Sequence, residues 1–247
     1  MTETLDHIRL ADRSIETVAS ILGLENFDLT EFSMPEAEEI WGMENRALGL
    51  ILALIKSVSP SVVIELGTYK GRSAAAIGAL LKNIGHGKLF TVDDFRAIEC
   101  TDSERLFNDL ELNDVVVQIC GTTSEAFSNW GRERIDVLII DAAHDFVSAC
   151  TDIALWSRLL SPTGWMIIHD TRTRLLRRFP EDYIHPLYEY QILDISDVKP
   201  GSTHYRWEGL AFVRFKRRNW EDHTAQGMTF SRERVRWGGA LELSDNG

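Results

Sequence analysis

Five short apolar runs, separated by helix-like segments, constrain the fold of this chain more than any other feature. The runs are residues 61–66, 88–93, 115–120, 135–141 and 165–170. Each is apolar at successive positions, so both faces of the corresponding strand need to be covered. Strands of this kind that alternate with helices are typical of a mostly parallel sheet with helices on both sides. The sequence therefore predicts a doubly wound α/β fold.

The segments around these runs complete the expected order of elements. We expect helices at residues 73–82, 102–112, 123–130 and 145–160, the last ended by the Ser-Pro-Thr-Gly sequence at 161–164. A mostly helical stretch at 173–190 and two more strands at 191–198 and 209–215 would follow. Before the first run, the spacing predicts an amphipathic helix at 3–22. A second helix would begin at a capping box, Ser33 to Glu36, and stop at Ser59-Pro60.

Composition excludes several classes of partner. The 247 residues include 26 Lys and Arg against 38 Asp and Glu, a net charge of −12, which disfavours nucleic acid and anionic membranes. The apolar runs at 48–55 and 74–81 are far shorter than the roughly 20 residues of a membrane span. The three cysteines form no CxxC motif, which fits a reducing compartment. We expect a cytoplasmic protein, although the basic clusters at 172–178, 216–218 and 232–236 leave an acidic or phosphorylated substrate open.

Acidic residues follow the strands at one edge of the predicted sheet. Asp93, Asp141 and Asp170 each end one of the apolar runs. In open α/β sheets, ligands bind beyond the carboxyl ends of the strands. We therefore expect the functional site at this edge.

A glycine-containing turn at residues 65–73 follows the first strand. Gly67 and Gly71 lack a Cβ atom, so the backbone could approach a ligand at the start of the next helix. Their spacing is neither the GxGxxG of dinucleotide-binding folds nor a phosphate-binding loop. Glu65, two residues before Gly67, suits a cationic ligand better than a pyrophosphate.

This segment resembles that of the class I S-adenosylmethionine-dependent methyltransferases. It is closest to small-molecule O-methyltransferases of the catechol O-methyltransferase kind and to bacterial relatives that modify antibiotics and sugars. The resemblance covers about residues 60–215. It implies a Rossmann-like, mostly parallel seven-stranded sheet with an antiparallel last strand. The cofactor contacts that it implies are Glu65, Gly67, Thr68, Tyr69, Gly71, Ser73, Asp93, Thr122, Thr123, Ser124 and Asp141.

The ends of the fourth and fifth runs suggest a metal ion. Two carboxylates on neighbouring strand ends, Asp141 and Asp170, suit a hard cation such as Mg²⁺. His169 and Thr171 are further candidate ligands; the catechol enzyme has asparagine where this chain has Thr171. His144 stands where the catechol enzyme has a lysine base. An imidazole can take a proton at neutral pH, so His144, with Asp141, is the predicted catalytic group.

The resemblance thus predicts methyl transfer to a hydroxyl of a small molecule. Residues 59–218 would be the catalytic domain, preceded by a helical segment at 1–58 that caps the site or forms a homodimer and followed by a tail at 219–247. Two alternatives stay open: a metal-independent small-molecule methyltransferase, and a subunit that binds S-adenosylmethionine without catalysis. A methyltransferase that acts on the amino groups of nucleic-acid bases is disfavoured, because Asp141-Ala-Ala-His144 stands where such enzymes have an Asn/Asp-Pro-Pro-aromatic motif. The identity of the acceptor is not readable from the sequence.

Overall fold

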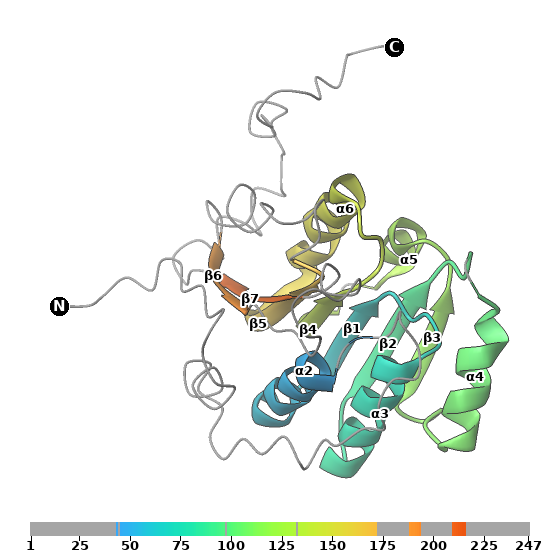
Figure 1. The fold of residues 1–247 in the computed structure, drawn as a ribbon. Helices are drawn as coiled ribbons and strands as arrows, with labels where there is room; N and C mark the ends of the chain where they lie inside the picture. Colours follow the sequence, from blue (N-terminus) through green and yellow to red (C-terminus); the bar gives the residue numbers. More distant parts are fainter. Residues whose placement is uncertain are drawn as a thin grey trace, which may run out of the picture.

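A single mixed sheet forms the centre of the protein. The structure, a computed structural model, describes residues 43, 45–96, 98–131, 133–171, 188–193 and 209–215. Seven strands lie in the order β3-β2-β1-β4-β5-β7-β6, with helices on both sides (Figure 1). The reversal of strand order between β1 and β4 is the place where doubly wound sheets bind their ligands.

The five apolar runs form five parallel strands, as predicted. They are β1 (Val62–Leu66), β2 (Lys88–Asp93), β3 (Val116–Cys120), β4 (Ile135–Ile140) and β5 (Leu160–His169). β7 (Leu210–Phe215) runs antiparallel between β5 and β6 (Tyr188–Leu193). The predicted fold, a mostly parallel seven-stranded sheet with a reversed last strand, is therefore confirmed.

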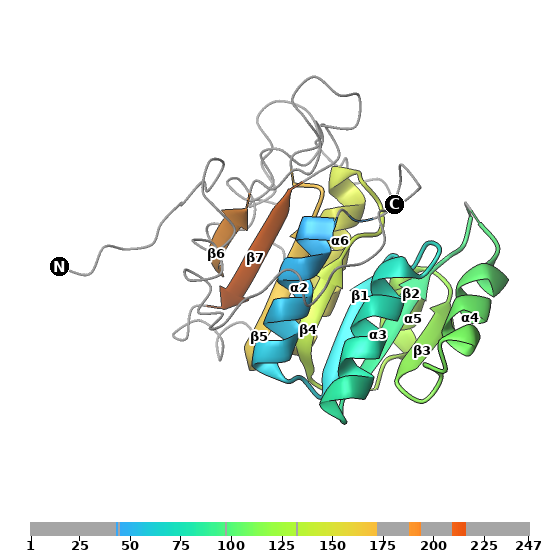
Figure 2. The same cartoon turned by 60° about the horizontal axis from the view of Figure 1, so that its bottom comes forward.

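Two hydrophobic layers cover the two faces of the sheet. α2 (Asn45–Val58), α3 (Arg72–Ile84) and α4 (Cys100–Asp109) lie on one face, and α5 (Thr123–Asn129) and α6 (Phe146–Trp156) lie on the other (Figure 2). Alternate residues of one strand enter different layers: Val63 packs with α2 and α3, whereas Ile64 packs with Trp156 of α6. Every residue of β1 is buried, as the run without polar alternation predicts.

The start of β5 differs from the sequence prediction. Residues 161–164 were expected to separate helix from strand, but α6 ends at Trp156, a short 3₁₀ turn (Ser157–Leu159) follows, and β5 already begins at Leu160. The extra residues form a bulge: Ile135 of β4 pairs with Leu160, and Val137 pairs with Trp165. Proline and glycine fit this position because a bulge interrupts the ladder of hydrogen bonds.

β6 is a second correction. Residues 188–190 were expected to end a helix and 191–198 to form a strand, but the strand covers Tyr188–Leu193. Pairing with β7 sets these bounds, because Tyr188 lies opposite Phe215 and Leu193 opposite Leu210. The expected helices at 3–22 and 173–187, the capping box at Ser33–Glu36 and the tail at 219–247 lie outside the described residues. Of the helices in the described part of the chain, none has the length and apolarity needed to cross a membrane.

Candidate functional site

A cavity of about 700 Å³ opens at the carboxyl ends of the central strands. Its walls come from the turns after β1 and β2 and from the segments after β3 and β4. Nine of the residues singled out in the sequence line it: Gly67, Thr68, Tyr69, Ser73, Asp93, Thr122, Thr123, Asp141 and His144. Glu65, Gly71 and Ser124 were also expected to contact the cofactor, and the structure places them outside the lining.

The two glycines of the turn are required by protein packing. A Cβ atom on Gly67 would lie 2.1 Å from the carbonyl oxygen of Asp141, so β1 and β4 could not approach as they do. A Cβ atom on Gly71 would lie 2.9 Å from the side chains of Ser103 and Phe107 on α4. From the sequence, both glycines were expected to leave room for a bound ligand. This explanation is corrected, because the Asp141 backbone and α4 fill the two spaces.

Glu65 lies buried beneath the cavity and is tied to its wall. Thr91 Oγ1 donates a hydrogen bond to Glu65 Oε2 over 2.6 Å and lies 2.7 Å from Thr68 Oγ1, which belongs to the lining. Glu65 Oε1 has no hydrogen-bond partner among the described residues. Burial raises the pKa of Glu65 to about 7, against the lowering effect of the Ser73 and Thr91 hydroxyls. A cation that binds near such a buried carboxylate stabilises its ionised form.

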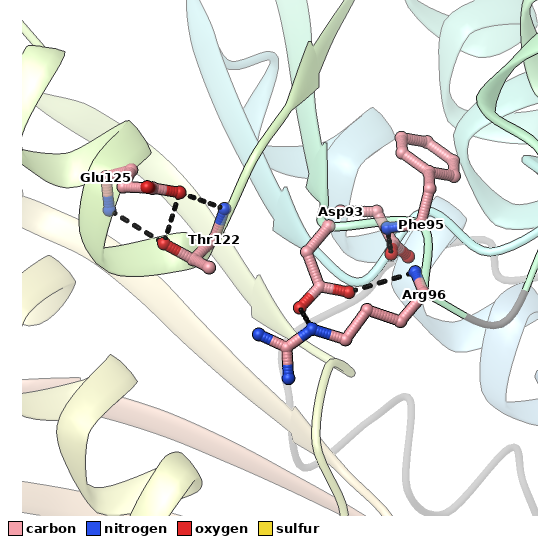
Figure 3. A network of polar contacts seen from close by, with 6 residues as sticks. Asp93, Phe95, Arg96, Thr122 and Glu125 are labelled. Carbon is pink, nitrogen blue, oxygen red and sulfur yellow. Dashed lines mark hydrogen bonds and ion pairs between the residues drawn. The ribbon is translucent and has the colours of Figure 1, made fainter.

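Asp93 organises two loops at the rim of the cavity. Its Oδ2 accepts a hydrogen bond from the backbone N–H of Tyr69, and its Oδ1 accepts one from Phe95 (2.8 Å each). Figure 3 shows Asp93 beside Phe95. The next acid, Asp94, forms an ion pair of 2.9 Å with Arg96. Asp93 therefore fixes the backbone after β1 and β2, and it still lines the cavity.

The segment after β3 begins α5 with a capping box. Thr122 Oγ1 accepts from the Glu125 N–H, and Glu125 Oε2 accepts from the N–H and the hydroxyl of Thr122 (Figure 3). Thr123 donates to Asp152, a buried acid of α6 whose pKa burial raises to about 6. Asp152 lines the cavity and was not found from the sequence, because its position inside a predicted helix gave no signal.

Two histidines pair with the two predicted metal-binding acids. His169 Nδ1 lies 2.9 Å from Asp141 Oδ1, and His144 Nδ1 lies 2.6 Å from Asp170 Oδ2. His169 and Asp170 are buried, whereas the His144 side chain is 42% exposed and reaches the cavity. Carboxylate oxygens accept hydrogen bonds, so each Nδ1 carries the proton in these contacts. The structure thus brings these four side chains together.

The charges in this cluster shift one another's pKa values. Burial raises the pKa of Asp141, with His169 opposing that effect. Burial also acts to raise the pKa of Asp170, but the charge of His169 and the hydrogen bond with His144 bring it down to about 2. The hydrogen bond with Asp170 raises the pKa of His144. Opposite shifts of neighbouring acids are common at functional sites.

The oxygen atoms of the cluster fit a hard divalent cation. Thr171 Oγ1 is buried without a hydrogen-bond partner among the described residues, and Asp170 Oδ1, also buried, lies 3.4 Å from His169 Nδ1. Donor atoms of Asp141, His169 and Asp170 lie within 4.8 Å of one another. Mg²⁺ prefers carboxylate and hydroxyl oxygens. Asp170 also holds a φ of 58°, a costly conformation for a residue other than glycine, and such strain is common at functional sites.

The chain is similar to known methyltransferases, both in part of its sequence and in its fold. Residues 64–171 match the family model of a methyltransferase domain. The fold is similar to a Podospora anserina methyltransferase bound to S-adenosylhomocysteine (17% identity, 83% of this chain and 97% of that chain, TM-score 0.58). It is similar to the O-methyltransferase TomG from Streptomyces achromogenes, involved in tomaymycin synthesis, in complex with S-adenosylmethionine (15% identity, 84% of this chain and 92% of that chain, TM-score 0.56). It is also similar to an rRNA methylase from Streptococcus thermophilus (13% identity, 70% of this chain and 99% of that chain, TM-score 0.54).

The matched segment contains most of the site. It begins inside β1, ends at Thr171, and includes the glycine turn, Asp93, His144 and the acid–imidazole pairs. The sheet has the seven strands and the reversed last strand that the resemblance implied. Residues 64–171 therefore match a methyltransferase domain, and the sheet has the fold of the methyltransferase structures to which the chain is similar.

Proposed function

We propose that this protein transfers a methyl group from S-adenosylmethionine to a hydroxyl of a small molecule, with the help of a divalent cation. The observation that carries the proposal is the meeting of two features at one edge of the sheet. The cavity formed by the turns after β1, β2 and β3 is also lined by Asp141 and His144, and His144 pairs with Asp170 behind it. A cofactor in the cavity would thus face the acids and the base.

The cofactor would supply an electrophilic methyl group on a sulfonium. Glu65 would balance the positive charge of its methionine part through the turn at Gly67 to Ser73, and Asp93 would bind its ribose. Thr122 and Thr123 would border its adenine, with Asp152 beside them. The contacts already formed in this wall, such as Asp93 with the Tyr69 N–H, hold these groups in place before binding. Preorganisation of this kind lowers the entropy cost of bringing two reactants together.

The acceptor hydroxyl would lose its proton to His144. Because Nδ1 of His144 donates to Asp170, the basic nitrogen of the neutral ring is Nε2. Asp170 therefore orients the ring and selects its tautomer, as carboxylates do for other catalytic histidines. Asp141, Asp170 and Thr171 would hold a cation, which when bound lowers the pKa of a nearby hydroxyl. His169 would orient Asp141, because its Nδ1 proton points at that carboxylate.

One observation favours a second candidate, a metal-independent methyltransferase. Both acids already have an imidazole partner, so hydrogen bonds from the two histidines can satisfy Asp141 and Asp170 without an ion. In that case His144 and Asp170 alone would position and deprotonate the acceptor.

Chelation separates the two candidates. With labelled S-adenosylmethionine and a panel of phenols, catechols and glycosides, we expect transfer that EDTA abolishes and added Mg²⁺ restores. Loss of a cation that lowers the pKa of the hydroxyl and orients it should cost at least about 100-fold in rate. Binding of S-adenosylhomocysteine measured by calorimetry serves as the control and should survive EDTA. Transfer that persists in EDTA would identify the metal-independent enzyme, and cofactor binding without transfer to any acceptor would contradict the proposed O-methyltransferase.

Glu65 makes cofactor affinity depend on pH. A cation favours the ionised carboxylate, and the pKa of Glu65 in the free protein is about 7. Below that pH a proton must leave before the cation binds, so affinity should fall by up to about tenfold per pH unit. Glu65→Gln should lower the affinity for S-adenosylhomocysteine at pH 8 by about 10–100-fold, since the negative charge that would balance the cofactor's positive charge is lost.

Calorimetric titrations between pH 5.5 and 8 test this prediction. The Glu65→Gln protein should lose the change in affinity centred near pH 7, whereas Glu111→Gln, on an exposed residue outside the cavity lining, should behave as the wild type. A wild-type affinity that does not change with pH would show that Glu65 does not face the cofactor's charge.

The location and assembly of the protein stay predictions from the sequence. The cytoplasmic compartment and the homodimer are part of the proposal, as is the absence of a nucleic-acid or membrane partner. The similarity to an rRNA methylase concerns the fold, and it makes RNA a useful negative control in the acceptor panel.

A further inference from the structure

A second group of metal-binding side chains lies at the outer edge of the sheet, apart from the acid–imidazole cluster. It consists of Cys100, Glu104 and Cys120, whose sulfur and oxygen atoms all lie within 4.8 Å of one another. None of the three lines the cavity. The proposed methyl transfer makes no use of them.

Sequence position and fold together bring these side chains to one place. Cys100 is the first residue of α4, and Glu104 lies four residues later, on the same face of the helix. Cys120 is the last residue of β3, which α4 adjoins at the edge of the sheet (Figure 1). Gln118 fixes the two elements together: its side chain donates to the Cys100 carbonyl and accepts from the Ser103 hydroxyl. The donor group is therefore built on two anchored elements.

We propose that Cys100, Glu104 and Cys120 bind a thiophilic divalent ion of the Zn²⁺ type. Two thiolates and a carboxylate are ligands that Zn²⁺ accepts, with water in the fourth position. Thiolates discriminate against Mg²⁺, so this site and the oxygen-rich cluster would take different ions. Ligand atoms around a tetrahedral zinc lie roughly 3.8 Å apart, which small side-chain rotations reach from the observed arrangement.

The surroundings of the cluster favour a cation. The Glu104 carboxylate belongs to the cluster, and Glu99 directly precedes Cys100. The same negative groups attract a dication, which in turn stabilises the thiolates. Cys120 is exposed and Cys100 is partly exposed, so an ion can enter from solvent.

The ion would join two parts of the cavity wall. Cys100 directly follows the loop that contributes Asp94, Arg96 and Ile98 to the lining. Cys120 pairs with Asp93 in the sheet and directly precedes the turn to Thr122. An ion held by both cysteines would therefore clamp α4 to the end of β3 beside the cofactor.

Cadmium titration of the reduced, metal-free protein tests the site. Cd²⁺ is a spectroscopic probe for Zn²⁺ sites, because thiolate ligands give it an ultraviolet charge-transfer band. We expect one Cd²⁺ per chain with this band, displaced by Zn²⁺ and unaffected by Mg²⁺. Cys100→Ser and Cys120→Ser should remove the band. Glu104→Gln should weaken binding by at least the roughly 10–100-fold that changes around metal ligands cost.

The third cysteine supplies the matched control. Cys150→Ser, in α6, should keep the band, and so should Asp170→Asn in the acid–imidazole cluster. In the wild type, Cd²⁺ should protect Cys100 and Cys120 from alkylation, read by mass spectrometry, while labelling of Cys150 stays unchanged. This measurement needs no variant. A wild type without the band, a band that survives both cysteine substitutions, or unprotected Cys100 and Cys120 would each overturn the proposal.

Discussion

Replacing Gly67 with alanine should destabilise the protein by about 2–6 kcal/mol and abolish cofactor binding. Gly67 has a φ of 103°, and an added Cβ atom would lie 2.1 Å from the backbone oxygen of Asp141. Strained backbone and overpacking each cost about 1–3 kcal/mol. Backbone cannot move aside here, because the Asp141 N–H donates to the Leu66 carbonyl within the sheet. The free energy of unfolding from urea titration measures the first effect, and calorimetry with S-adenosylhomocysteine measures the second.

Two other glycines separate the causes of this loss. Gly85 has a φ of 88° but open space around its Cβ position. Gly85→Ala should therefore lower the free energy of unfolding only through backbone strain, by about 1–2 kcal/mol. Gly131 has neither restriction, and Gly131→Ala should change stability by less than about 0.5 kcal/mol. A Gly67→Ala protein as stable as Gly85→Ala would show that β1 and β4 can separate without cost.

The sequence predicted the parallel part of the fold well because burial on both faces leaves a clear pattern. The β1 segment has no polar residue except Glu65, and its predicted and observed bounds differ by one residue. Where partner strands decide the bounds, prediction from the sequence failed. β5 gains Leu160 through pairing with Ile135 across a bulge, and β6 begins at Tyr188 because β7 continues to Phe215. Local composition does not encode such long-range pairing.

Part of the candidate site could be predicted because its residues follow the predicted strands. Residues at strand ends, such as Asp93, Asp141 and Asp170, could be placed together from the topology alone. Asp152 could not, because it reaches the cavity from the middle of α6. The role of Gly71 was also misjudged: its open side faces Phe107 of α4, which lies 36 residues further along the chain. Packing between distant segments is what single-sequence patterns omit.

His144 has the largest expected effect on the reaction itself. If His144 takes the proton of the acceptor hydroxyl, His144→Ala should lower kcat by about 10²–10⁴-fold, the usual contribution of a general base. The affinity for S-adenosylhomocysteine should change by less than about threefold, because Glu65 and Asp93 hold the cofactor in the proposed arrangement. Initial rates at saturating Mg²⁺ and cofactor, with a matched His86→Ala control, measure the effect. His86 is exposed and contacts Ser59, outside the cavity lining, so that variant should keep wild-type activity.

The contact of His144 with Asp170 requires one further distinction. Loss of the imidazole also frees Asp170 Oδ2, which could weaken a bound cation and lower the rate indirectly. An indirect effect would raise the Mg²⁺ concentration needed for half-maximal activity, and excess Mg²⁺ would restore kcat. A missing base leaves that concentration nearly unchanged and kcat low at every concentration of Mg²⁺. Recovery of wild-type kcat in excess Mg²⁺ would therefore make His144 a residue that positions Asp170, and the proton would have to leave by another group.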